Sequence, residues 1–211
     1  MGMGSGGGRV ASASPNWTVA DAQAEQQTYD FNVKDRAFKV QTDYFQTAHS
    51  WDINEQLRDV AAGKRNSLDV REQNNVDAMD SYMRPLSKPV TVYRFVERDT
   101  MNFFGITSIE NPNSDEVVGT HITDPAFMST SYDVTANVFK HRDILLRMHV
   151  PKGHPAIIPD NAFESEIALS RNTGYTITGV RREMVKLDRF NSEEKLVIDV
   201  VVDKPKRQRR K

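Results

Sequence analysis

The chain has 211 residues, a formal net charge of -1 and 38% hydrophobic residues, and its mean hydropathy is -0.60. This length suits one domain and is sufficient to bury a sizeable core. No apolar run approaches the length of a membrane span, which excludes an integral membrane protein built from helices. The chain has no cysteine, which excludes disulfides, thiolate nucleophiles and cysteine-based zinc sites.

The two ends of the chain differ in composition from the middle. Residues 1–16 are rich in glycine and serine and predict a flexible leader. They lack a basic stretch followed by an apolar stretch, so we expect no secretory signal and a cytoplasmic location. Residues 204–211 contain six basic residues in eight and predict a disordered tail that could contact nucleic acid or another acidic surface. Residues 17–203 are expected to form a single domain.

The first part of that domain, residues 17–89, has helical character. Ile53 and Leu57 are spaced at i and i+4, which places them on one helix face, and Gly63 is a natural end for that helix. A further helix is expected before Pro85, which cannot continue it.

The second part, residues 90–203, predicts a β-rich core. Its strand-like segments are short, rich in valine, isoleucine and aromatic residues, and separated by glycine, proline, asparagine and aspartate; they are 90–96, 126–131, 144–150, 154–159, 165–170, 176–183 and 195–202. Helices followed by strands indicate an α+β fold rather than an alternating α/β fold. The sequence contains no G-x-G-x-x-G and no P-loop, which excludes the nucleotide sites that these motifs build.

Polar residues interrupt three of the apolar strands. They are Arg94 in TVYRFV, residues 129–131 (Ser-Thr-Ser) after AFM, and the pair Glu164 and Glu166 after AF. A strand would place both glutamates on one face, with about 7 Å between their Cα atoms. Taken singly, an arginine in a strand or an E-x-E pair is usually solvated, and Ser-Thr-Ser is usually a turn.

In this order and spacing, the three clusters resemble the signature of the R-S-E class of mono-ADP-ribosyltransferases, the arginine-type enzymes of bacterial toxins and bacteriophages. The stretch SWDINEQLR, residues 50–58, is similar to the helical I-N-x-x-L-R element of bacterial members, and residues 76–94 are similar to the following helix, proline-bearing turn and strand. The resemblance covers roughly residues 40–200. It implies a helical N-terminal part followed by a mixed β-sandwich core of the ADP-ribosyltransferase type.

The resemblance also implies a reaction and the residues that carry it. NAD would be the substrate, and the bond between nicotinamide and ribose would break with positive charge developing on the ribose, as in glycoside hydrolysis. Glu166 would stabilise that charge, Ser129 would orient Glu166 and the ribose, and Arg94 would hold the phosphates. The resemblance implies two further NAD contacts, from the backbone of Phe95 and from Thr130. Thr130 also fits a role in shaping the strand. Relatives often have glycine at the Phe95 position, so the phenyl ring is expected to narrow the nicotinamide site.

Glu164 would have a separate role, because in arginine-modifying relatives the first glutamate of E-x-E positions the incoming guanidinium. Arg142, in the loop after the S-T-S strand, fits either a phosphate contact or a surface ion pair. The five histidines show no metal-ligand spacing, so no metal is expected.

These features predict an NAD-dependent arginine ADP-ribosyltransferase that modifies a target protein. The enzyme is expected to belong to a bacteriophage acting in the host cytoplasm, or to be a delivered effector. Two alternatives stay open. The same site would make an NAD glycohydrolase if water were the acceptor, and the fold with its basic tail would suit a structural, virion-associated or nucleic-acid-binding protein.

Overall fold

The computed structural model describes residues 14–28, 44–45, 49–159 and 165–205. Its longer helices are α1 (Val19–Gln26), α3 (His49–Ala61) and α4 (Val70–Tyr82), and its short ones are α5 (Met101–Phe104), which follows the turn Arg98–Thr100, and α6 (Ser114–Val117). The strands are β1 (Arg84–Pro85), β2 (Val90–Val96), β3 (His121–Asp124), β4 (Met128–Ser131), β5 (Ile144–Val150), β6 (Pro155–Ile157), β7 (Glu166–Leu169), β8 (Thr173–Lys186) and β9 (Ser192–Val202).

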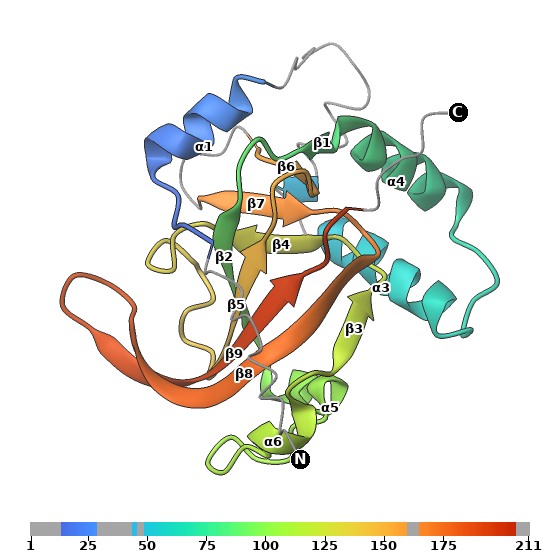
Figure 1. Cartoon of the computed structure of the whole chain (residues 1–211). Coiled ribbons are helices and arrows are strands. Elements are labelled where there is room, and N and C mark those ends of the chain that lie inside the picture. The colour runs from blue at the N-terminus through green and yellow to red at the C-terminus, as the bar shows by residue number, and fades with distance from the viewer. Residues whose placement is uncertain (1–13, 29–43, 46–48, 160–164, 206–211) are drawn as a thin grey trace, which may run out of the picture.

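The strands form one mixed sheet in the order β1-β6-β7-β4-β2-β5-β9-β8-β3, in which β5 and β9 are parallel. The sheet is nearly divided in two, because β4 and β2 pair only at Tyr93 and Ser131. In Figure 1, β4 and β7 lie across the direction of β2 and β5. Helices followed by two crossed sheet halves confirm the predicted α+β fold with a mixed sandwich core.

The main core fills the space between the two halves. Val92 and Leu146 come from one half, and Met128 and Ile167 come from the other. These four side chains are all at least 98% buried, and each such residue contributes roughly 1.5–3 kcal/mol through removal of apolar surface from water. The crossed arrangement is therefore stabilised by the burial that it allows.

A second core holds the helices against the sheet. Ile53 and Leu57 of α3 and Met79 of α4 pack with Phe127, which directly precedes β4. Helix α3 ends just before Gly63, which adopts a left-handed conformation with φ of 71°. Glycine reaches this conformation without strain. The i, i+4 spacing of Ile53 and Leu57 thus fixes which face of α3 turns away from the core and towards the site.

The strand predictions for residues 90–96 and 144–150 match β2 and β5 to the residue. The prediction for β8 was too short, and β3 and β1 were not predicted at all. The outer part of the β8–β9 hairpin carries ion pairs such as Arg182 with Glu194 instead of an apolar face, so it lacks the alternation that marks a half-buried strand.

Segment 14–16, at the end of the predicted leader, lies beside β2. The backbone N–H of Thr91 donates to the carbonyl of Pro15 over 2.9 Å, and its hydroxyl donates to the carbonyl of Ser14 over 2.6 Å. Trp17 follows, buried, with its indole N–H donating to the carbonyl of Pro89 over 3.0 Å. Among the helices that the structure describes, none is long and apolar enough to cross a membrane.

Candidate active site

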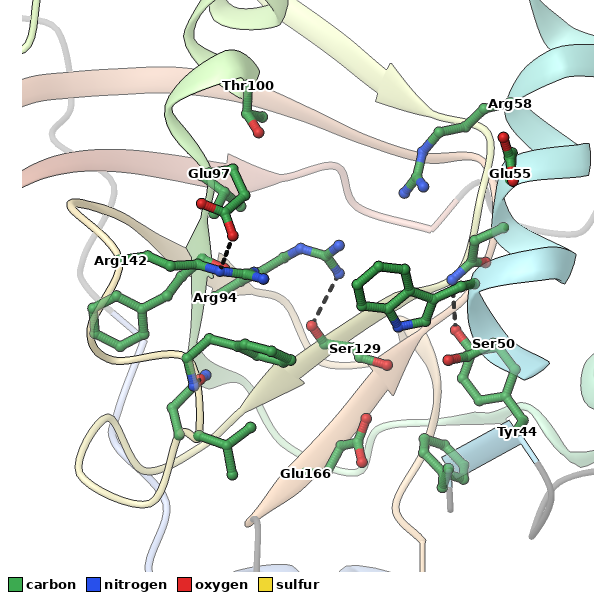
Figure 2. Close-up of a pocket in the computed structure, with 18 of the residues that line it drawn as sticks. Tyr44, Ser50, Glu55, Arg58, Arg94, Glu97, Thr100, Ser129, Arg142 and Glu166 are labelled. Carbon is green, nitrogen blue, oxygen red and sulfur yellow. Dashed lines mark hydrogen bonds and ion pairs between the residues drawn. The ribbon is translucent and has the colours of Figure 1, made fainter. Parts of the chain in front are cut away.

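A cavity of about 740 Å³ opens where the two sheet halves separate. It is lined by α3, by the end of β2 and the turn after it, by Ser129 of β4 and Glu166 of β7, and by the loop between β4 and β5. Figure 2 shows the labelled side chains of Arg94, Ser129 and Glu166 converging from these elements. The three polar clusters of the sequence therefore meet in one place.

Arg94 crosses the gap between the sheet halves. Its Nη1 donates a hydrogen bond to the backbone carbonyl of Ser129 over 3.0 Å. Burial lowers the pKa of the Arg94 guanidinium from its ordinary value, Asp124 opposes this shift, and Arg58 adds to it. The guanidinium stays charged over the physiological range, because an arginine pKa starts far above it, and a bound anion would offset the cost of its burial.

Ser129 and Thr130 point in different directions, as successive strand residues do. Ser129 lines the cavity together with Tyr44. Thr130 is buried outside the cavity lining, and its hydroxyl donates to the carbonyl of Ile167 over 2.6 Å. This contact ties β4 to β7, which fits the strand-shaping role expected for Thr130, and its contact with NAD stays a prediction.

Glu166 is the first residue of β7 and pairs with Ser131 of β4. Its side chain lines the cavity although the residue is only 8% exposed. The preceding Ser165 is buried in a left-handed conformation with φ of 51°, and its carbonyl accepts a hydrogen bond from the N–H of Tyr132 over 2.9 Å. This turn, which is strained for a residue other than glycine, fixes the start of β7 and hence the position of Glu166. Glu164 lies outside the described residues.

Phe95 is among the residues that line the cavity, and its expected contact with NAD stays a prediction. Alternation along β2 places Arg94 on one face and Phe95 on the other, where its ring is buried with Leu145 and Val197 in a small separate core. The backbone carbonyl of Phe95 accepts a hydrogen bond from Nη1 of Arg142 over 3.2 Å.

The helix α3 adds residues to which the sequence had assigned no role. Asn54 and Arg58 are also spaced at i and i+4, one position along from the buried pair Ile53 and Leu57, and both line the cavity. Asn54 accepts from the N–H of Phe127 through Oδ1 over 3.1 Å and donates from Nδ2 to the Tyr44 hydroxyl over 3.0 Å. The signal in the sequence that could have identified Asn54 and Arg58 is their i, i+4 spacing directly after an apolar pair with the same spacing.

Tyr44 lies at the centre of this network and is 1% exposed. Its hydroxyl accepts a hydrogen bond from Nδ2 of Asn54 on α3 over 3.0 Å, and Tyr44 and Ser129 line the same cavity. Burial raises the pKa of Tyr44, and the charge of Glu166 acts in the same direction. Tyr44 is therefore a neutral hydroxyl at physiological pH that is bonded to Asn54 beside Ser129.

Arg58 and Arg94 together form a cationic boundary between this cavity and a second one. The second cavity, of about 600 Å³, is more apolar and shares Arg58 and Arg94 with the first. Nη2 of Arg58 lies 3.3 Å from the carboxylate of Asp124, which is 8% exposed and also accepts from the N–H of Ala126 over 3.0 Å. Two arginines beside each other suit a ligand that carries two negative charges.

Arg142 also lines the first cavity. Of the two roles expected for it, the structure shows an ion pair, and the phosphate contact stays a prediction. Its Nε lies 2.7 Å from a carboxylate oxygen of Glu97, and its guanidinium carbon lies 4.1 Å from the centre of the Phe139 ring. Figure 2 shows the ion pair at one wall of the cavity. Within the described part of the chain, no three His, Asp or Glu side chains are grouped so as to hold a metal ion.

Comparison with known proteins gives the family of this chain. The model of the family described as ADP-ribosyltransferase exoenzyme matches residues 26–204. The chain belongs to the ADP-ribosyltransferase exoenzyme family. Membership assigns the class of reaction, transfer of ADP-ribose from NAD, and leaves the acceptor open.

Solved structures of ADP-ribosyltransferases share the fold of this family member. Plx2a, an ADP-ribosyltransferase toxin from Paenibacillus larvae, is 20% identical with a TM-score of 0.67, over 87% of this chain and 93% of that one. C3stau2 from S. aureus, solved with NAD, is 22% identical with a TM-score of 0.67, over 92% and 100%. C3larvin toxin from Paenibacillus larvae is 22% identical with a TM-score of 0.63, over 88% and 94%. No curated protein gives a significant match.

Proposed function

We propose that this protein is a mono-ADP-ribosyltransferase that binds NAD in the 740 Å³ cavity and transfers ADP-ribose to an arginine of a target protein. One observation carries the proposal. A buried carboxylate, Glu166, lines the same cavity as two arginines, Arg58 and Arg94. An NAD molecule needs both features, because its phosphates are anionic and its ribose becomes cationic when nicotinamide leaves.

In the proposed mechanism, the arginines bind the diphosphate of NAD, and Glu166 stabilises the positive charge on its ribose. Arg94 and Arg58 hold the diphosphate, and the planar donor group of each suits phosphate oxygens. Glu166 faces the ribose and stabilises the positive charge that develops as the bond to nicotinamide lengthens. Because the carboxylate is already held in place by the turn at Ser165, it does not reorganise during the reaction.

Ser129 and Tyr44 are proposed to keep this arrangement in register. The backbone carbonyl of Ser129 accepts a hydrogen bond from Arg94, and Ser129 lines the cavity with Tyr44 and Glu166, so a single residue links the phosphate-binding and ribose-binding parts of the site. Glu164, two residues before Glu166, is proposed to position the guanidinium of the acceptor, since a carboxylate matches a guanidinium in geometry and charge.

The test is transfer of label from radiolabelled NAD into the proteins of a bacterial or animal cell lysate, with nicotinamide release measured in the same reactions. We expect labelled protein, with the modified side chain identified as arginine by mass spectrometry. Nicotinamide release without labelled protein would instead indicate an NAD glycohydrolase. Absence of both would contradict the proposed function.

The Glu166→Gln variant is the control for the site. It keeps the shape of the side chain and removes its charge, so both transfer and nicotinamide release should fall about a hundred- to thousandfold, while NAD still binds. Retention of more than a tenth of the wild-type rate would remove Glu166 from the proposed role.

Four points stay predictions: arginine as the acceptor, a bacteriophage origin, a host cytoplasm as the place of action, and a contact of the basic tail with nucleic acid.

A further inference from the structure

Arg142 is held from three sides at the edge of the cavity. Nη1 donates to the Phe95 carbonyl over 3.2 Å, the guanidinium stacks on the Phe139 ring at 4.1 Å, and Nε lies 2.7 Å from Glu97. The Arg142 side chain is 17% exposed. It is thus a largely buried cation with one nearby carboxylate.

The contact between Arg142 and Glu97 is close but poorly directed. Despite its short distance to Glu97, Nε of Arg142 is the one buried side-chain nitrogen or oxygen, among the residues described by the structure, without an aligned hydrogen bond. A buried donor without an aligned acceptor costs free energy. The position therefore favours an acceptor that approaches Nε along its N–H direction, as an oxygen of a bound anion can.

The Glu97 carboxylate can also separate from Arg142. Its side chain is 60% exposed, so its charge can be hydrated when it turns away. The ion pair of Arg58 with Asp124 differs in this respect, because the Asp124 side chain is only 12% exposed and is held by the N–H of Ala126. Of these two pairs at the cavity, only the one with Glu97 can exchange its carboxylate at low cost.

The loop that carries Arg142 stays attached if this ion pair opens. The next residues in each segment, Arg98 and Asp143, form a second ion pair with Nε of Arg98 2.6 Å from the carboxylate. The Phe95 carbonyl and the Phe139 ring also keep their contacts with Arg142. Exchange of the carboxylate would thus leave the guanidinium in place at the cavity wall.

We propose that Glu97 is a resident counter-ion of Arg142 that competes with the diphosphate of the substrate, so that binding exchanges a carboxylate for a phosphate oxygen. This inference rests on the proposed function, because it assumes that NAD occupies the cavity. It adds Glu97 as a residue that sets affinity for the substrate and Arg142 as a third cation for its diphosphate. Removal of the Glu97 charge should therefore strengthen binding of NAD. If Glu97 only held Arg142 in place, its removal would weaken binding of NAD.

The test compares Glu97→Gln with Asp99→Asn by equilibrium titration of NAD and of ADP-ribose, in the Glu166→Gln background to prevent turnover. Asp99 lines the same cavity two residues further on, and none of its described contacts is with Arg142, so its variant removes one negative charge as a matched control. An ion pair whose carboxylate is mostly exposed contributes modestly. We therefore expect Glu97→Gln to tighten binding of both ligands about two- to fivefold and Asp99→Asn to change it by less.

A double-mutant cycle completes the test. In an Arg142→Gln background, Glu97→Gln should no longer tighten binding, because there is no cation left to release. Weaker or unchanged binding in Glu97→Gln, an equal gain in Asp99→Asn, or a gain that persists without Arg142 would overturn the inference while NAD binding itself upholds the proposed function. Failure of the Glu166→Gln protein and the wild type to bind NAD would overturn both.

Discussion

Arg94 donates from Nη1 to the backbone carbonyl of Ser129 over 3.0 Å, and so joins β2 to β4 just beyond the single residue pair that connects the two sheet halves. A side chain thus replaces the backbone ladder at the point where the strands separate. The same guanidinium lines the cavity. This one contact therefore fixes the position of the Arg94 guanidinium in the site and also joins the two sheet halves.

This contact predicts the behaviour of Arg94→Lys. An ammonium can donate to the Ser129 carbonyl or to a phosphate but lacks the planar group of donors that contacts two oxygens together. We expect NAD to bind about tenfold or more weakly, as for the loss of a charge-assisted hydrogen bond of about 1.5–3 kcal/mol. Titration in the Glu166→Gln background measures the effect. An unchanged affinity would reduce Arg94 to a structural tie between the sheet halves.

Tyr44→Phe should slow NAD cleavage with little change in the fold. The ring keeps its edge-on packing against Phe127, with centroids 5.8 Å apart, but Nδ2 of Asn54 loses its acceptor beside Ser129. We expect a loss of about 1–2 kcal/mol in the free energy of unfolding and a fall of about tenfold in nicotinamide release.

Tyr93→Phe is the matched control for that variant. The Tyr93 hydroxyl donates to Asn16 over 2.9 Å in an exposed contact, and Tyr93 packs with the small core on the opposite face of β2 from Arg94. Its loss should leave nicotinamide release unchanged. Equal effects of the two variants on the rate would show that Tyr44 acts through stability alone.

Glu164→Gln should separate the two activities of the enzyme. Glu166 still stabilises the cation in this variant, so NAD should bind and be cleaved slowly to water, while transfer to arginine falls about a hundredfold or more. Nicotinamide release and ADP-ribosylation of agmatine, a small guanidinium acceptor, are measured in the same tubes. If both activities fall equally, Glu164 supports the NAD site, and if transfer is fully retained, Glu164 is a solvated strand residue.

His154 predicts how stability depends on pH. The residue is 5% exposed, and burial lowers its pKa to about 4; its Nε2 lies 3.1 Å from the hydroxyl of Thr173, which donates to the carbonyl of Ser170. Between pH 6.5 and about 4, the unfolded state binds a proton that the folded state does not. Stability should therefore fall as the pH is lowered through this window, by at most about 3 kcal/mol, at 1.36 kcal/mol per pKa unit.

Denaturant titrations at several pH values check this dependence, with His154→Gln as the control. Glutamine can still donate to Thr173 but does not titrate, so its curve should be flatter between pH 6.5 and 4. A wild-type curve as flat as that of the variant would show that His154 is protonated without cost in the folded state.

The sequence by itself determined the fold class, the bounds of β2 and β5, and the three polar clusters of the site. Runs of valine, isoleucine and leucine bounded by turn residues leave little choice but a buried strand. Arg94, Ser129 and Glu166 could be selected because each is a polar interruption of such a run. Local pattern is sufficient for the strands, since each depends on residues close together in the chain, whereas the three site residues were assigned from the order and spacing of their clusters, which resemble the family signature.

Only the tertiary structure decided which side chains reach the cavity. Thr130 and Phe95 are next to site residues in sequence, but strand alternation turns both away once the register of β2 and β4 is set. Tyr44, Asn54 and Arg142 enter the site because packing of α3 on Phe127 and the return of the β4–β5 loop bring them there. These contacts join residues far apart in the chain, and their geometry follows from burial of the shared core, which no local pattern encodes.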